Sequence, residues 1–194
     1  MKRSEKIRIG VSLLILAVSV TIVIVPLYLV VLNSFKPYSE IAKNISALLI
    51  SIMMPLAVGS ISALISGNTM AYQTLIRPPL SPPAFLFPVV WTILYLLMGI
   101  SSYMIYVSGD PNTGKALKYY ALQLLFNFGW SILFFGLSQY LLSFIWLIAL
   151  ILLIAVMIYQ FYRISPLAAC LQIPYLLWCL FAAYLNLSIY LLSR

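Results

Sequence analysis

The stretch RPPLSPPAFLFPVVWTILYLLMGI, from Arg77 to Ile100, joins a proline-rich segment directly to an apolar run. Proline fixes φ and pushes the preceding residue toward extended backbone, so the first seven residues cannot be helical. The uncharged residues that follow are long enough for a helix that crosses a bilayer, which takes about 20 mostly apolar residues. The stretch therefore predicts a membrane-spanning helix that is entered from a stiff, polyproline-like loop.

The composition of the whole chain supports a membrane protein. Of 194 residues, 64% are hydrophobic and 7% are charged, whereas an average soluble domain carries about 25% charged residues. The formal net charge of +8 comes mostly from scattered basic residues, with one cluster within residues 2–8 before the first apolar run. We interpret that cluster as a topology signal that keeps the N-terminus in the cytoplasm, and we expect a multi-pass protein of a prokaryotic cell membrane with no nucleic-acid partner.

Six segments have the length and character of membrane spans. They are residues 9–32, 45–65, 86–107, 117–137, 141–161 and 166–192. Their apolar runs are unbroken, which favours helices over the alternating strands of a membrane barrel. The sequence therefore predicts an all-α integral membrane bundle. The chain has no histidine, the commonest general base and a common metal ligand, so we expect no metal site and no required cofactor.

The two cysteines, Cys170 and Cys179, fall in the last of these segments. Nine residues apart on an intact helix, they would be about 13 Å apart along its axis. Bridged cysteines need Cα atoms within about 7 Å, so an intact helix excludes a disulfide between them.

Polar and aromatic side chains recur at helical spacing in three of the predicted spans. These stripes are Trp91 and Tyr95 in the third span, Tyr120, Gln123, Asn127 and Trp130 in the fourth, and Tyr175, Trp178, Ala182 and Asn186 in the sixth. One interpretation is a pocket for a flat, mostly apolar ligand with a polar edge. The alternative is that the amides join helices while the rings anchor at the membrane interface. Spacing alone leaves both open.

Two weaker patterns also have two interpretations each. Gly59, Ala63 and Gly67 form a row of small residues that suits close helix packing or the wall of a pocket. Leu187, Tyr190 and Arg194 match a loose sterol-contact pattern, and they equally suit an interfacial anchor.

Three longer stretches resemble one known family. YQTLIRPPLSPPAFLFPVVWTILYLLMGIS (residues 72–101), YALQLLFNFGWSILFF (120–135) and SPLAACLQIPYLLWCLFAAYLNLSIY (165–190) are similar to the first-loop and second-helix, third-helix and fifth-helix motifs of the TspO/MBR family. That family comprises the tryptophan-rich sensory proteins and translocator proteins, including the peripheral-type benzodiazepine receptor. The similarity runs in order from about residue 45 to residue 192.

The resemblance implies a five-transmembrane-helix bundle over residues 44–194, with loop 67–85 as the lid of a pocket. Residues 1–43 would then add a basic N-terminus, an extra N-terminal transmembrane helix and a linker. The family resemblance also implies a homodimer. The ligand-binding residues that it implies are Tyr72, Pro78, Pro83, Trp91, Tyr95, Gln123, Asn127, Trp130, Tyr175, Trp178, Ala182 and Asn186.

The function implied by the resemblance is that of a membrane receptor or sensor that binds porphyrins and other tetrapyrroles, with sterols as ligands of some members. Transport or sequestration of the ligand would follow from binding. The alternative is a light-dependent porphyrin-degrading enzyme that uses Trp91 and Trp178. Two departures from the family pattern bear on the ligand: the usual Trp-Tyr pair is Ala71-Tyr72, and the aromatic residue between the proline pairs is Leu80.

Overall fold

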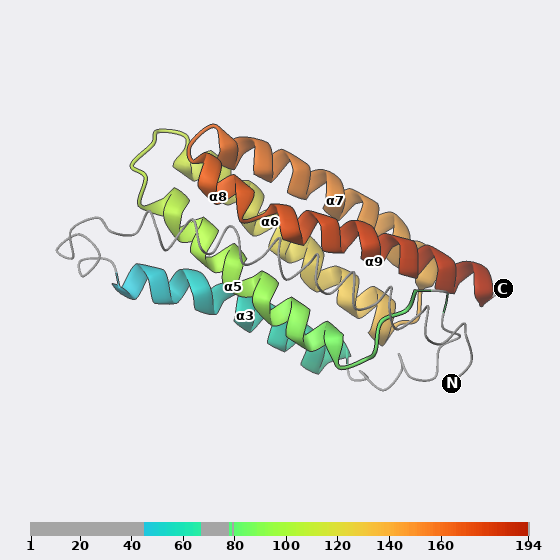
Figure 1. The fold of residues 1–194 in the computed structure, drawn as a ribbon. Helices are drawn as coiled ribbons and strands as arrows, with labels where there is room; N and C mark the ends of the chain where they lie inside the picture. Colours follow the sequence, from blue (N-terminus) through green and yellow to red (C-terminus); the bar gives the residue numbers. More distant parts are fainter. Residues whose placement is uncertain (1–44, 67–77, 79, 194) are drawn as a thin grey trace.

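The computed structural model describes residues 45–66, 78 and 80–193 (Figure 1). Its elements are α3 (Ile45–Ser66), α5 (Leu86–Tyr106), α6 (Thr113–Ser131), the π-helix η1 (Ile132–Gly136), α7 (Tyr140–Tyr162), α8 (Pro166–Cys170) and α9 (Ile173–Leu192). No strand occurs within these residues, so the expected all-helical fold is confirmed. The expected span 9–32, the first region 1–43 and most of the loop 67–85 lie outside the described residues.

The long helices lie side by side in one elongated bundle (Figure 1). α3 packs along α5, α7 packs along both α6 and α9, and α6 also contacts α3 and α5. The centre of the bundle is apolar, with Met98 of α5 and Leu150, Ile154 and Met157 of α7 completely buried.

Among the residues that the structure describes, four helical segments are long and apolar enough to cross a membrane: α3, α5, α7 and the combined α8–α9 segment, Pro166–Leu192. α6 is not among them, although a span was expected over residues 117–137. It is shorter and more polar, because it begins at Thr113 and carries Lys115, Lys118 and two buried amide side chains. The lysines are exposed in its first two turns, so the apolar part of α6 starts only after them. Beyond Ser131 the helix widens into η1.

The expected single helix over residues 166–192 is interrupted between Cys170 and Ile173. Pro174 has no N–H to give to the carbonyl of Cys170, so the regular ladder fails at this point. The N–H of Gln172 instead donates to the carbonyl of Ala169 at 3.0 Å. The intact helix on which the disulfide argument depended is therefore absent, but both cysteines are free.

Glycines set the closest contacts between α3 and α5. A Cβ placed on Gly99 would lie 2.6 Å from the Cα of Ile52 and 2.8 Å from the carbonyl oxygen of Ser51. A Cβ on Gly59 would collide with the ring of Tyr95. The two helices therefore approach one another only because these positions have no side chain.

The described part of the proline-rich loop differs from the expected polyproline-like chain. The N–H and the hydroxyl of Ser81 both donate to the carbonyl of Pro78, at 3.2 and 2.8 Å, which closes a tight turn. Leu80 has a φ of 69°, a left-handed conformation that the third position of a type II turn requires. Prolines restrict φ but do not prevent a turn whose third residue reverses the chain.

Candidate functional site

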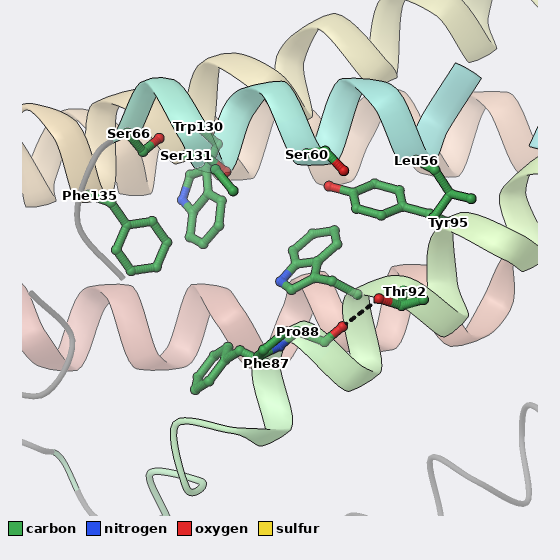
Figure 2. Close-up of a pocket in the computed structure, with 13 residues that line it drawn as sticks. Leu56, Ser60, Ser66, Phe87, Pro88, Thr92, Tyr95, Trp130, Ser131 and Phe135 are labelled. Atoms are coloured by element: carbon green, nitrogen blue, oxygen red, sulfur yellow. Dashed lines mark hydrogen bonds between the residues drawn. The ribbon is translucent and has the colours of Figure 1, made fainter. Parts of the chain in front are cut away.

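A cavity of about 260 Å³ lies between α3, α5 and the junction of α6 with η1 (Figure 2). The lining residues come from these elements alone. They are Leu56, Gly59, Ser60, Ala63 and Ser66 of α3, Phe87, Pro88, Trp91, Thr92 and Tyr95 of α5, Trp130 and Ser131 of α6, and Phe135 of η1.

The α3 wall of this pocket is built from small side chains on one helical face. Gly59, Ser60 and Ala63 follow one another at spacings of one and three residues, and Ser66 lies three further on. This arrangement leaves room beside the helix backbone that larger side chains would fill. Of the expected row of small residues, Gly59 and Ala63 line the pocket, while Gly67 lies outside the described residues. Gly59 also makes a packing contact with Tyr95.

Aromatic rings form the opposite wall. Trp91 stacks on Tyr95 with ring centroids 5.4 Å apart and lies 6.4 Å from Trp130. Trp130 in turn contacts Phe135 edge to face at 6.0 Å. Figure 2 shows Trp130 and Phe135 at one end of the pocket, and Tyr95 with Leu56 at the other. The site therefore offers broad π surfaces to a flat ligand.

Hydrogen bonds behind this wall hold the rings in place. The hydroxyl of Tyr95 donates to Oδ1 of Asn127 at 3.0 Å, and Nδ2 of Asn127 donates to the hydroxyl of Tyr175 at 3.0 Å. Asn127 thereby connects α5, α6 and α9 through one fully buried side chain.

Asn186 has a similar arrangement on α9. Its Oδ1 accepts from Nε1 of Trp130 at 3.2 Å and from the hydroxyl of Ser143 at 3.1 Å, while its Nδ2 donates to the carbonyl of Tyr140 at 2.8 Å. The oxygen and the amide nitrogen of Asn186 therefore both form hydrogen bonds to neighbouring helices. The bond from Nε1 of Trp130 holds the ring of that tryptophan in place.

The structure brings three of the expected site residues into the pocket: Trp91, Tyr95 and Trp130. Asn127, Tyr175, Gln123, Ala182 and Asn186 are buried in the interior but do not line it. Trp178 is also buried, and its ring contacts that of the lining residue Phe87 edge to face at 5.9 Å.

The remaining expected residues lie elsewhere or are not described. Pro78 is buried and Pro83 is exposed, and neither lines the cavity. Leu187 is exposed and Tyr190 is half-buried near the end of α9. Tyr72 and Arg194 lie outside the described residues.

Sequence reasoning missed the hydroxyl groups of the pocket. Ser60, Ser66, Thr92 and Ser131 line it, and the hydroxyl of Thr92 already donates to the carbonyl of Pro88 at 2.8 Å (Figure 2). The hydroxyl of Ser66 is buried and has no hydrogen-bond partner among the described residues. Ser60 and Ser66 lie on the same helical face as Gly59, and that spacing was the available signal.

The lining residues carry no charge. The part of the chain that the structure describes also contains no group of three or more His, Cys, Asp or Glu residues placed to hold a metal ion. The pocket as described therefore suits recognition by stacking and by a few neutral hydrogen bonds.

Comparisons with known proteins agree with the fold. The model of the TspO/MBR family matches residues 51–192. The chain is 37% identical over 153 residues to the tryptophan-rich protein TspO of Chlorobaculum tepidum, covering 76% of this chain and 96% of the relative. It is 38% identical over 152 residues to the protein of the same name from Archaeoglobus fulgidus, covering 77% and 99%. Similarity to the translocator protein of Ovis aries is 38% over 118 residues, covering 59% and 70%. The chain therefore belongs to the TspO/MBR family.

Proposed function

We propose that the protein is a membrane receptor or sensor that binds porphyrins and other tetrapyrroles, with sterols as further candidate ligands, in the pocket between α3, α5 and α6. The observation that carries this proposal is the stack of Trp91, Tyr95 and Trp130 along a cavity with no charged lining residue. A tetrapyrrole is flat and largely apolar, so it matches such a wall.

The size of the cavity bears on how the ligand is held. Its volume of about 260 Å³ lies just below the range of roughly 300–1,000 Å³ that encloses a drug-sized ligand. We therefore expect one edge of a tetrapyrrole to enter beside Trp91, while its acidic substituents stay outside among water and lipid headgroups. A ligand held by one edge in this way suits sensing or sequestration. Transport would follow if the ligand is later released.

The hydroxyl of Ser66 is the candidate hydrogen-bonding handle for the inserted edge. It is buried in the lining and has no partner among the described residues. A ligand N–H or carbonyl group within reach would satisfy it, and a neutral hydrogen bond of this kind contributes about 0.5–1.5 kcal/mol. Ser66→Ala should therefore weaken binding by a factor of about ten or less.

Tryptophan fluorescence tests the proposal. Titration of the purified full chain with protoporphyrin, haem and a sterol, side by side, should quench the emission with protoporphyrin. Trp91→Leu should weaken the binding of protoporphyrin about fivefold or more, because tryptophan is enriched among the contact residues whose loss costs more than about 1 kcal/mol.

Trp146→Leu is the matched control. Trp146 does not line the pocket; it stacks on Phe126 at 4.5 Å and donates to the carbonyl of that residue at 2.8 Å. This variant should keep the wild-type affinity. Equal affinities in Trp91→Leu and the wild type would move the site elsewhere, and a wild type that binds none of the three ligands would refute the proposed function.

A further inference from the structure

A layer of buried polar side chains lies apart from the pocket, toward the end of the bundle that holds α8. Gln123 and Gln172 are both 0% exposed. Neither the oxygen nor the nitrogen of either carboxamide has a hydrogen-bond partner among the described residues. The hydroxyl of Tyr120, also buried, has none either. Buried polar groups in folded proteins nearly always have a partner, and a low-dielectric membrane interior makes the lack of one unfavourable.

Two of these groups, Tyr120 and Gln123, lie together on α6. Tyr120 and Gln123 are three residues apart on one face of α6. Ser102 of the neighbouring α5 is also buried. The hydroxyl of Ser102 itself donates to the carbonyl of Gly99 at 2.9 Å.

The third group, Gln172, reaches a similar level because α6 and α9 run in the same direction (Figure 1). Gln123 precedes Asn127 by one turn, Gln172 precedes Tyr175 by three residues, and Asn127 and Tyr175 are hydrogen-bonded to one another. Ser101, next to Ser102, donates to the carbonyl of Ala168 at 2.7 Å, which joins α5 to α8. Gln172 follows at the break before α9, where its N–H donates to the carbonyl of Ala169 at 3.0 Å. The layer is therefore assembled from α5, α6 and the α8–α9 break, and not from residues of the pocket wall.

The chemistry of these groups defines what they would bind. Each carboxamide offers two N–H donors and one carbonyl acceptor, and the Tyr120 hydroxyl can do both. None of them is charged, so nothing in the layer would neutralise an ion. A small neutral molecule that donates and accepts at once is required, and a buried water typically makes about three hydrogen bonds to such groups. We propose that Gln123, Gln172 and Tyr120 form an internal hydration site that holds one or a few ordered water molecules.

The site is also connected to the back of the pocket wall. Asn127 lies one turn beyond Gln123, and Tyr175 lies three residues beyond Gln172. These two side chains are hydrogen-bonded to one another, and Asn127 also accepts from Tyr95 of the pocket wall. The waters would extend this chain, so that the polar line runs from the pocket into the α8 end of the bundle.

Direct observation tests the proposal on the unmodified full chain in lipid. An experimental structure at a resolution that shows waters should have ordered density within about 3.2 Å of polar atoms of both glutamines. An interior without such density, or carboxamides that pair with protein groups, would overturn the proposal.

The sign of a stability change gives a second test. Gln123→Met and Gln172→Met keep roughly the side-chain length but remove the polar atoms. If water is bound, each variant removes hydrogen-bond partners from that water and from the remaining polar side chains. The Tm should then fall by about 2–4 °C. Leu150→Met, a swap at a fully buried apolar position, is the control for a change of packing. An unchanged or higher Tm in both glutamine variants, with the control unaffected, means that the carboxamides are unsolvated and contradicts the proposal.

Discussion

Asn127 is the residue that most clearly sets the arrangement of helices around the pocket. Its side chain is 1% exposed and bonds to the hydroxyls of Tyr95 and Tyr175 at 3.0 Å each. Hydrogen bonds between membrane helices average only about 0.6 kcal/mol, because side chains also find partners in the unfolded state. The importance of Asn127 therefore lies in geometry, since it fixes the ring of Tyr95 against Trp91.

We predict that Asn127→Leu lowers the free energy of unfolding by about 1–3 kcal/mol. The two tyrosine hydroxyls lose their buried partner, and an unsatisfied buried group costs more than the bond itself contributes. Unfolding in mixed detergent, followed by helix content, measures the change. Adding Tyr95→Phe and Tyr175→Phe to Asn127→Leu removes the orphaned hydroxyls and should restore part of the loss. A triple variant that is less stable than Asn127→Leu would show that the bonds are not the cause.

Residue spacing could predict that these side chains face inward, but not what they contact. The stripe on α6 correctly places Gln123, Asn127 and Trp130 on its buried face. Spacing fixes the direction of a side chain on its own helix, whereas its partner depends on the depth and angle of the neighbouring helix. Trp130 combines both proposed roles, because its ring lines the pocket while its N–H bonds Asn186.

At the scale of elements, α3 is held chiefly by its packing along α5. Only 11% of the apolar stretch of α3 that could span a membrane is buried, compared with 50% of the corresponding stretch of α5. Gly99 lets the backbone of α5 approach Ile52 and Ser51 of α3. Because α3 forms one whole wall of the pocket, its distance from α5 sets the width of the site.

We predict that Gly99→Ala destabilises the protein by about 1–3 kcal/mol, the usual cost of overpacking, and weakens ligand binding by displacing α3. The new Cβ would meet backbone atoms of α3, which cannot rotate away as a side chain can. Thermal unfolding and the fluorescence titration measure the two effects.

Gly114→Ala serves as the control for this change. A Cβ at Gly114 has nothing within 4 Å, and alanine favours helix by up to about 1 kcal/mol over glycine. This variant should be as stable as the wild type or more so. If both alanine variants behave alike, the close approach of α3 and α5 does not govern stability.

The positions of the helices were predictable because a bilayer requires long apolar runs, and those runs are plain in the sequence. The places where these helical segments are interrupted were less predictable. Pro174 indicates a break, but the two-residue gap before α9 depends on the alternative bond from Gln172 to Ala169. The π-helix Ile132–Gly136 arises where Phe134 and Phe135 pack against Trp130, and tertiary packing of that kind leaves no local signal.

At the scale of the whole molecule, the pocket lies on the least buried side of the bundle. α6, α7 and α9 pack closely together around an apolar centre, while α3 contacts chiefly α5 and, less extensively, α6 and η1. A pocket between a well-packed body and an outer helix that is mostly exposed can admit a flat ligand with a small movement of one element. This asymmetry, which depends on how the helices associate, could not be deduced from helical patterns taken one at a time.

The first 42 residues should be dispensable for this architecture. The family model begins at residue 51, and the two bacterial and archaeal relatives are matched over 96% and 99% of their lengths by 76% and 77% of this chain. A truncated chain of residues 43–194 keeps every residue that lines the pocket. We predict that it inserts in the membrane and unfolds within a few degrees of the full chain. Its tryptophan fluorescence should be quenched at a similar concentration of protoporphyrin.

The control is a chain that starts at residue 57, which lacks Leu56 and more than half of α3. This chain should lose both its stability and the quenching by protoporphyrin. If the chain of residues 43–194 folds as well as the full protein and yet does not bind a ligand that the full protein binds, the N-terminal region is part of the site.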